Sequence, residues 1–256
     1  MADIVLAEPN IALPPTQADL PYDDGVPMES WRHKVQMDLL IDALGPWLAE
    51  RADGFVGGNM FVYYSLAQVK HQDFRGPDFF AALGVPKGER RSWVVWEEGK
   101  APDVVIELLS DSTAKVDKSD KKRIYQNQMR VSEYFWFDPF NAEDWSGFSL
   151  RNGVYQPLAL NDRGQLISPM MGLSLVRWHG SYKGIGEIAW LRWATLEGEL
   201  LLVPQEIAEQ ERQRAEQVEL QLQQVALNLL QNAMSVEQVV QLTGLSETQV
   251  RNLQAR

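Results

Sequence analysis

Two short, almost wholly apolar runs on either side of a polar segment constrain the fold of this chain most. They read PDVVIELLS over residues 102–110 and EYFWFDP over residues 133–139. Strands of this kind are typical of sheets that are covered on both faces. The sequence between them, over residues 111–129, predicts a helix for which Ser112 and Thr113 are available as caps. This run therefore predicts an α/β fold.

Further elements are predicted before and after this run. Residues 28–49 have apolar side chains at a helical period, and Glu29 and Ser30 near their start are capping candidates. Segments rich in β-branched and aromatic residues, or in short β-like pieces, predict strands within residues 54–65, 74–83, 91–98 and 141–202. We therefore expect a mixed sheet flanked by helices, with a β-rich C-terminal part.

The chain is predicted to divide into three parts. Residues 1–20 are interrupted by three prolines and are expected to be an unstructured lead-in, and residues 21–203 form the α/β domain. At residue 204 the composition changes, because residues 205–232 hold eight glutamines and neither glycine nor proline. Glutamine is a fair helix former, so residues 204–256 are expected to be a helical tail that starts with one long helix.

The tail carries a heptad pattern and a second helical motif. The a/d seam of a coiled coil is indicated by hydrophobic residues at heptad spacing, namely Ala208, Ala215, Val218, Leu222, Val225 and Leu229. Glu211 at a d position weakens its first turns. The end of the tail predicts two helices around a turn at Thr243-Gly244, with Ser246 as a cap. This end has few basic residues, so we expect packing or homo-oligomerisation there rather than DNA reading.

Composition excludes several kinds of site. The chain has no cysteine, which excludes disulfides, thiolate-bound zinc or iron–sulfur clusters, and a cysteine nucleophile. Its three histidines, His33, His71 and His179, have no metal-ligand spacing. The net charge of -11 argues against broad adhesion to nucleic acid or to an anionic membrane. A polyanion would have to meet a local basic patch or a bound cation.

The sequence also bears on the cellular compartment. No run approaches 18 consecutive apolar residues, so we expect no membrane span. Acids stand in the first 20 residues where a signal peptide has Lys or Arg. We therefore expect a cytoplasmic protein.

Glu107 is the most informative polar residue of the α/β domain. It is an acid inside an apolar run, and a buried carboxylate is costly unless it is paired, hydrogen-bonded or bound to a metal. A buried ion pair alone would satisfy it. Asp78 enters an upstream strand after Pro77, a position that is also typical of a turn or strand edge.

The helix predicted after Glu107 places Asp117, Lys121 and Tyr125 on one face at i, i+4 and i+8. A surface salt-bridge ladder would give the same spacing. A lysine at this place is also able to reach back to the end of the Glu107 strand, where Asp78 would arrive from the neighbouring strand. Two such carboxylates can hold Mg²⁺, and a lysine beside them can orient or deprotonate a water, a set suited to phosphodiester hydrolysis.

At these residues the sequence resembles a known family. RGPDFF followed by APDVVIELLSDSTAKVDKSDKKRIYQNQMRVSEYFWFDP is similar to the Uma-type putative restriction endonuclease family, a bacterial branch of the PD-(D/E)XK nuclease superfamily. The resemblance extends from about residue 20 to residue 203. It implies a restriction-endonuclease-like fold and hydrolysis of DNA that depends on Mg²⁺, with Mn²⁺ as an alternative.

Carried over by position, the resemblance implies that Asp78 is the first metal-binding acid and Glu107 the second. The superfamily's usual lysine would stand two residues after the Glu, where this chain has Leu109. The resemblance therefore implies that Lys121, on the helix, takes this role. In the same hypothesis Tyr125 supports Lys121 or contacts phosphate. Ser110 and Thr113 match positions that cap or support the site, and Asp117 matches a family position to which the resemblance assigns no role.

Some family positions stay open. Asp103 either belongs to the motif or is a strand-entry residue. His33 matches a polar position on the first helix, and it either contacts the site or is a partly exposed structural histidine. An acid expected near the start of the family pattern is missing in its usual form, and the candidates to replace it are Asp23, Asp24 and Glu29.

The remaining features allow more than one interpretation. The nine tryptophans fall mostly in strand-like runs, which favours a core role over base stacking. The basic residues of the second helix, Lys115, Lys118, Lys122 and Arg123, form either a phosphate-binding patch or a solvated face. The alternative to an endonuclease is a catalytically inactive nuclease-fold module for DNA or protein binding, with oligomerisation through the tail.

Overall fold

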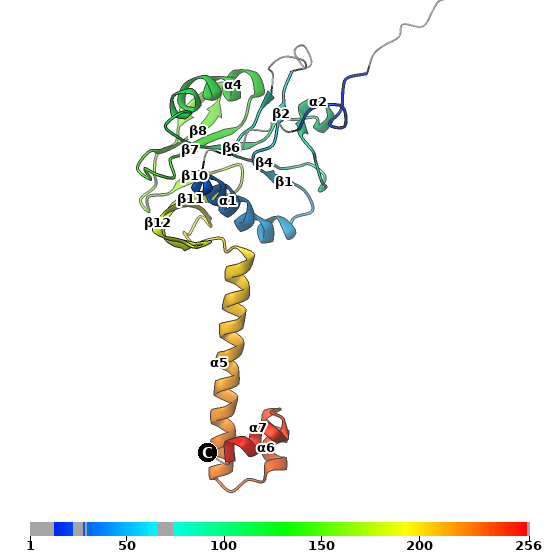
Figure 1. The fold of residues 1–256 in the computed structure, drawn as a ribbon, viewed down its shortest axis with the longest axis vertical. Helices are drawn as coiled ribbons and strands as arrows, with labels where there is room; N and C mark the ends of the chain where they lie inside the picture. Colours follow the sequence, from blue (N-terminus) through cyan, green and yellow to red (C-terminus); the bar gives the residue numbers. More distant parts are fainter. Residues whose placement is uncertain (1–12, 23–27, 29, 66–73, 255–256) are drawn as a thin grey trace, which may run out of the picture. The chain divides into compact units, whose positions relative to one another are not determined.

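The structure is a computed structural model of the chain, and it describes residues 13–22, 28, 30–65 and 74–254. Contacts divide the chain into two units, Met1–Val203 and Pro204–Arg256. Asp23, Asp24 and Glu29, the candidates for a further acid, lie outside the described residues, as does His71. Figure 1 shows the two units.

The first unit is built around a six-stranded sheet with the order β1-β4-β6-β7-β8-β9. The strands are β1 (Phe55–Gly57), β4 (Phe79–Ala82), β6 (Val104–Leu108), β7 (Glu133–Phe137), β8 (Trp145–Arg151) and β9 (Val154–Pro157). Strands β6 and β7 are parallel, and the other neighbours are antiparallel. The predicted α/β fold with a mixed sheet is confirmed.

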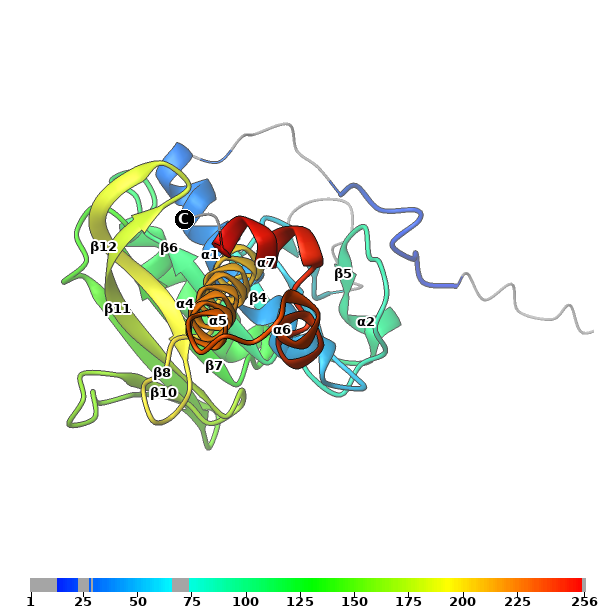
Figure 2. The ribbon, with the colours of Figure 1, turned by 90° about the horizontal axis from the view of Figure 1, so that it is seen from below.

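Two three-stranded sheets complete the unit. One has the order β3-β2-β5 and the other β10-β11-β12. Their strands are β2 (Val62–Tyr63), β3 (Phe74–Arg75), β5 (Trp93–Val94), β10 (Leu166–Ser168), β11 (Leu173–Tyr182) and β12 (Ile185–Ala194). Figure 2 shows β11 and β12 as a long, curved hairpin. These strands, with β8 and β9, are the expected β-rich C-terminal part.

One strand expectation is wrong over half of its length. Residues 91–98 were expected to be extended, but β5 ends at Val94 and the short helix α2 (Val95–Glu98) follows. Gly99 ends this helix with φ at 76°, a left-handed conformation that glycine adopts without steric cost. The chain therefore turns here instead of continuing the sheet.

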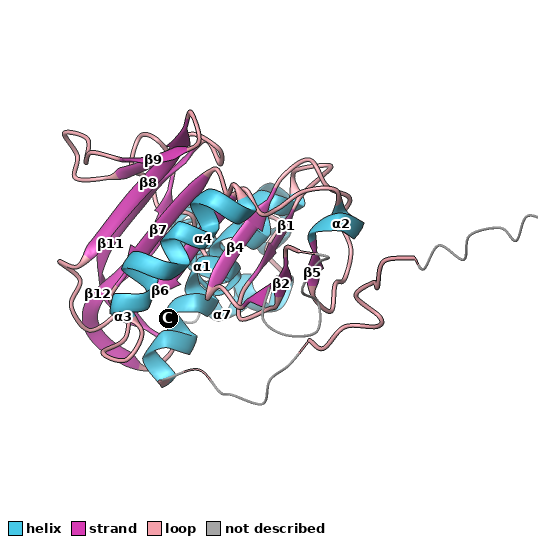
Figure 3. Cartoon of the chain, turned by 90° about the horizontal axis from the view of Figure 1, so that it is seen from above, coloured by secondary structure: helices cyan, strands magenta, loops and turns pink. Residues whose placement is uncertain are grey.

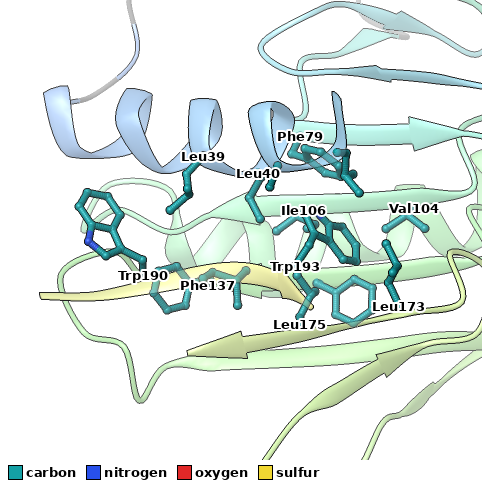
Figure 4. Close-up of a cluster of buried hydrophobic side chains, with 14 of the residues drawn as sticks. Leu39, Leu40, Phe79, Val104, Ile106, Phe137, Leu173, Leu175, Trp190 and Trp193 are labelled. Carbon is teal, nitrogen blue, oxygen red and sulfur yellow. The ribbon is translucent and has the colours of Figure 1, made fainter. Parts of the chain in front are cut away.

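Helix α1 (Trp31–Ala49) covers one face of the main sheet, and Ser30 caps it by accepting a hydrogen bond from the His33 N–H. The main core lies between this helix, the main sheet and the β10-β11-β12 sheet. Figure 4 shows Leu39 and Leu40 of α1 pointing from the helix into the core, where Leu40 lies near Ile106 of β6 and Trp193 of β12. This packing fixes which side chains of β6 face away from α1.

The opposite face carries the helical segment that follows β6, and Figure 3 shows it lying over the main sheet between β7 and β4. Its consecutive pieces are α3 (Ala114–Val116), η2 (Asp117–Lys121), α4 (Lys122–Ile124) and η3 (Tyr125–Met129), of which the η pieces are π-helical. π-Helical turns are rare in proteins, and those that occur are often found at functional sites. The expected helix is confirmed from residue 114 onward.

Of the two expected caps of this helical segment, Thr113 occupies the N-cap position but makes no side-chain cap bond. Thr113 Oγ1 accepts the Ser110 N–H at 3.3 Å instead, and Ser112 Oγ lies 3.0 Å from Ser110 Oγ. On this face Tyr125 and Met129 pack with Val105 and Tyr134 in a second core. Since side chains alternate along a strand, Glu107 points to the same face as Val105.

The expected lead-in lies partly outside the described residues, because residues 1–12 are not described. Residues 13–20 contain neither helix nor strand, but they are attached to the first unit. The Trp96 indole N–H donates to the Pro15 carbonyl at 2.7 Å, and Leu20 is buried beside Phe61 and Tyr63.

The second unit consists of α5 (Pro204–Gln231), α6 (Val236–Thr243) and α7 (Glu247–Gln254). The long helix and the turn at Gly244, where φ is 71°, agree with the prediction. Helices α6 and α7 pack against the C-terminal part of α5, where Ala226, Val239 and Val250 are buried. Within the described part of the chain, none of the helices combines the length and hydrophobicity of a membrane span.

The heptad seam of α5 is used in part inside the second unit. Leu222 and Leu229 pack against the cluster that α6 and α7 form, whereas Val218 and Val225 are 48% and 47% exposed. Homo-oligomerisation through this exposed part stays a prediction. Sedimentation of the wild-type chain against a Val218→Glu variant tests it.

Candidate active site

Asp78 and Glu107 come together because β4 and β6 are antiparallel neighbours. Phe79 lies opposite Ile106, and extending this register by one residue places Asp78 opposite Glu107. Asp78 Oδ2 also accepts the backbone N–H of Leu108 at 2.7 Å. The start of β4 and the end of β6 therefore bring both predicted metal-binding acids to one edge of the main sheet.

A loop after β1 supports Asp78 from behind. The Asn59 N–H donates to the Pro77 carbonyl at 3.0 Å, and a Cβ atom on Gly58 would lie 2.3 Å from the Asp78 carbonyl oxygen. Only a glycine permits so close an approach of two backbones. Sequence reasoning did not single out Gly58, although its place in the glycine-rich run GFVGGN was a signal.

Glu107 is fully buried, and both of its carboxylate oxygens have partners. The Tyr125 hydroxyl donates to Oε1 at 2.6 Å, and the Lys121 ammonium donates to Oε2 at 3.1 Å. The helical segment 114–129 thus places both predicted side chains over the end of β6. The i, i+4 spacing of Lys121 and Tyr125 brings them to one acid.

Asp117 completes the group from one turn earlier. Its Oδ1 lies 2.7 Å from Lys121 Nζ, and its side chain is 1% exposed. The Tyr134 hydroxyl of β7 donates to the Asp117 backbone carbonyl at 2.9 Å. Sequence reasoning missed Tyr134, although a tyrosine in a buried strand usually bonds through its hydroxyl. We call Asp78, Glu107, Asp117, Lys121 and Tyr125 the acid–lysine cluster.

The electrostatics of the acid–lysine cluster follow from burial and an excess of acids. Burial raises the pKa of Glu107, the nearby Lys121 charge lowers it, and the net direction is upward. Burial by itself lowers the pKa of Lys121, but the charges of Glu107, Asp117 and Asp78 together raise it above its ordinary value. Lys121 is therefore a cation at neutral pH. Burial also raises the pKa of Tyr125, which keeps its hydroxyl protonated as a donor.

The donor set of the acid–lysine cluster fits a divalent cation that keeps much of its hydration shell. Glu107 and Asp117 pair with the Lys121 ammonium and Asp78 acts on it through its charge, so three carboxylates share one cation and a negative excess remains to be neutralised. Within the described residues no group of three or more His, Asp or Glu side chains is arranged to hold a metal ion. Mg²⁺ usually binds through one or two carboxylates and fills its shell with water and phosphate oxygens. Asp78 and Glu107 suit that mode.

His33 lies next to this group but is not part of it. It is 2% exposed, so the expectation of a partly exposed histidine is wrong. Its Nε2 lies 2.9 Å from the Leu109 carbonyl, and its Nδ1 lies 2.8 Å from Ser30 Oγ. A carbonyl only accepts, so Nε2 carries the proton and Nδ1 accepts from the Ser30 hydroxyl. His33 thereby ties α1 to the residue that follows β6.

Ser110 and Thr113 form the turn between β6 and the helical segment. Their hydroxyl oxygens lie 3.0 Å apart, and the Thr113 N–H donates to Ser110 Oγ at 3.2 Å. Both therefore support the turn. Asp103 stands at the opposite end of β6, where it pairs with Lys100 at 2.7 Å and accepts the Leu83 N–H. It is a strand-entry residue and does not belong to the site.

The basic residues of the helical segment are mostly engaged within the chain. Lys118 pairs with Asp144 at 2.5 Å, and Arg123 pairs with Asp120 at 3.5 Å. The Lys122 ammonium lies 3.3 Å from the centre of the Phe148 ring. These contacts favour the interpretation as a helix face over a dedicated phosphate patch.

A groove of about 390 Å³ opens where β6 and β7 end. It is lined by Ser30, His33, Ser110, Asp111, Ser112, Asp138 and Phe140. Ser110 follows the end of β6 and Asp138 follows the end of β7. Grooves outside the carboxyl ends of parallel strands are the usual ligand sites of α/β sheets. Phe140 is 60% exposed there, and the Arg32 guanidinium lies 4.3 Å from its ring centre.

Fold and site together define an α/β protein with a carboxylate pair and a lysine at one edge of a mixed sheet. The family model Uma2, described as "Putative restriction endonuclease", matches residues 10–179, which is more than half of the chain. The chain belongs to this family. The match ends before the helical tail.

A comparison with curated proteins finds no match. Among solved structures, a similar chain is "a putative nuclease belonging to DUF820" from Anabaena variabilis, with 15% sequence identity and a TM-score of 0.42. The similarity covers 62% of this chain and 86% of that chain.

Proposed function

We propose that the chain is a Mg²⁺-dependent endonuclease that hydrolyses phosphodiester bonds of DNA. The meeting of Asp78, Glu107, Lys121 and Tyr125 at one edge of the main sheet carries this proposal. The four residues come from β4, β6 and the helical segment, and a structural ion pair needs only two of them. Membership of the family described as "Putative restriction endonuclease" supports the same reaction.

Four residues of the acid–lysine cluster have a role in this proposal. Asp78 and Glu107 would hold Mg²⁺ or Mn²⁺, and the bound cation would neutralise the scissile phosphate and stabilise the charge that develops in the transition state. Lys121 positions the attacking water or donates to a phosphate oxygen. Tyr125 fixes the Glu107 carboxylate by its hydrogen bond at 2.6 Å.

The acidic composition is compatible with this substrate. A net charge of -11 disfavours tight, nonspecific binding to DNA. The cation and Lys121 would supply positive charge at the one place where a phosphate must be bound. We therefore expect weak DNA binding that strengthens when Mg²⁺ is present.

The test is a cleavage assay on supercoiled, linear duplex and single-stranded DNA with Mg²⁺, Mn²⁺ or a chelator. We expect cleavage by the wild-type chain with either cation and none with the chelator. Glu107→Gln and Asp78→Asn should each abolish cleavage. A matched control is Glu133→Gln, which changes a buried acid on the neighbouring strand β7 outside the acid–lysine cluster.

Equal cleavage by the wild-type chain and both site variants would refute the assignment. If the folded wild-type chain binds DNA but cleaves none of these substrates with either cation, the alternative of an inactive binding module is favoured instead.

A further inference from the structure

Lys121 stands between two buried acids rather than beside one. Its ammonium lies 3.1 Å from Glu107 Oε2 and 2.7 Å from Asp117 Oδ1. Of the two acids, Asp117 is the closer partner. It is also nearly as buried as Glu107, since their side chains are 1% and 0% exposed.

Asp117 is held firmly in its place. It lies on the π-helical piece η2, and its carbonyl accepts the Tyr134 hydroxyl of β7 at 2.9 Å. Both of its carboxylate oxygens are buried, and within the described part of the chain neither has a hydrogen-bond partner, so the contact of Oδ1 with the Lys121 ammonium is an ion pair. A buried carboxylate with an unused oxygen is costly unless a charge nearby compensates for it. Lys121 is that charge, and the pair stays together because the backbone of Asp117 is fixed.

Glu107 has no unused oxygen of this kind. Tyr125 occupies Oε1 and Lys121 occupies Oε2. A divalent cation at Glu107 therefore competes with the Lys121 ammonium for the same carboxylate. If Glu107 were its only partner, Lys121 would be left as an unpaired charge in a buried place, which opposes cation binding.

We propose that Asp117 is a positioning residue that keeps the Lys121 ammonium paired when the Glu107 carboxylate binds a divalent cation. This inference rests on the proposed function. Because Asp117 and Lys121 are four residues apart on the same helical segment, the ammonium keeps one partner at 2.7 Å while it gives up the contact at 3.1 Å. Lys121 then remains a fixed cation beside the reacting phosphate.

The test measures Mg²⁺ binding to the full chain by calorimetry without nucleic acid, and separately kcat and KM on DNA. Asp117→Asn keeps the volume of the side chain and removes its charge. We expect it to weaken Mg²⁺ binding by tenfold or more and to lower kcat by a similar factor, with KM for DNA changed less than threefold. Asp117→Glu should recover part of both losses.

A double-mutant cycle separates this role from a simple loss of negative charge. If Asp117 acts through Lys121, Asp117→Asn should change Mg²⁺ affinity less than threefold in a Lys121→Met background. An equal loss in both backgrounds would overturn the inference. The matched control is Asp144→Asn, which removes the partner of Lys118 on the same helical segment and should leave Mg²⁺ binding unchanged.

The outcomes also separate this inference from the proposed function. Wild-type Mg²⁺ affinity and kcat in a folded Asp117→Asn variant would overturn the inference and leave the proposed function intact. A wild-type chain that neither binds Mg²⁺ nor cleaves DNA would overturn both.

Discussion

Buried acids lie at both ends of strand β6, and their negative charges are compensated in different ways at the two ends. At the carboxyl end, the acid–lysine cluster places three carboxylates around one ammonium. At the other end, a group that we call the support cluster consists of Lys100, Asp103, Glu133 and Ser168. There Asp103 pairs with Lys100, and Glu133 accepts from the Ser168 hydroxyl and from the Met170 N–H at 3.1 Å.

The difference shows that burial alone does not mark a functional acid. Glu133 is 1% exposed and Glu107 is 0% exposed, so burial does not distinguish them. Each acid of the support cluster has partners of its own, which is the arrangement expected of structural polar groups. The acid–lysine cluster instead shares one cation among several acids and retains a negative excess, which a divalent cation can neutralise.

Replacing one lysine at each end of β6 tests most directly whether the two ends differ in function. Lys121→Met should lower kcat for DNA cleavage by about 10²–10³-fold, because a fixed charge at the reacting phosphate is lost. Lys100→Met removes a lysine that pairs with Asp103 and should leave kcat unchanged for folded protein. Comparable losses of activity in the two variants would show that the ends of β6 do not differ in function.

A second prediction concerns the backbone behind Asp78. Gly58→Ala places a Cβ atom 2.3 Å from the Asp78 carbonyl oxygen, so Asp78 must shift. A displacement of about 1 Å in a catalytic group can cost about 10²-fold in rate, and we expect kcat to fall by about that factor. Gly45→Ala is the control, because a Cβ atom there meets nothing within 4 Å. Full activity of the folded Gly58→Ala variant would show that this loop does not position Asp78 for the reaction.

The fold could be predicted where local sequence decides it. The apolar runs over residues 102–110 and 133–139 became β6 and β7, and the glutamine-rich run became α5. Local pattern misjudged residues 95–98, where Gly99 turns the chain out of the expected strand. It placed Thr113 correctly at the start of the second helix, but it could not show that the Thr113 hydroxyl bonds Ser110 across the turn instead of capping the helix.

The members of the candidate site could be predicted where one pattern joined two elements. An acid inside an apolar strand followed by Asp, Lys and Tyr at helical spacing pointed to Glu107 and its partners. Gly58 and Tyr134 could not be found in this way, because their contacts with Asp78 and Asp117 join residues that are distant in sequence. The burial of His33 was missed for the same reason, since its ring bonds the carbonyl of Leu109, a residue distant in sequence.

The support cluster predicts an effect on stability instead of activity. Glu133→Ala leaves the Ser168 hydroxyl and the Met170 N–H without their acceptor. Removing the partner of a buried donor costs about 1–3 kcal/mol, and we expect the free energy of unfolding to fall by that amount. Urea unfolding of the wild-type chain and the variant measures this loss, and kcat per folded molecule should not change. A loss of activity without a loss of stability would indicate that Glu133 belongs to the active site.

The smallest effect is the pH dependence that Glu133 adds to stability. Burial raises the pKa of Glu133 above its ordinary value of 4.5, although the bonds from Ser168 and Met170 oppose the shift. The folded state therefore binds this proton more tightly than the unfolded state, and stability falls as pH rises from about 4.5 through the raised pKa. Glu133→Gln has no such proton. The difference in unfolding free energy, wild type minus Glu133→Gln, should decrease with pH across this window and be constant below it. Urea unfolding at several pH values tests this, and a difference that increases with pH would show that hydrogen bonding to the charged form outweighs burial.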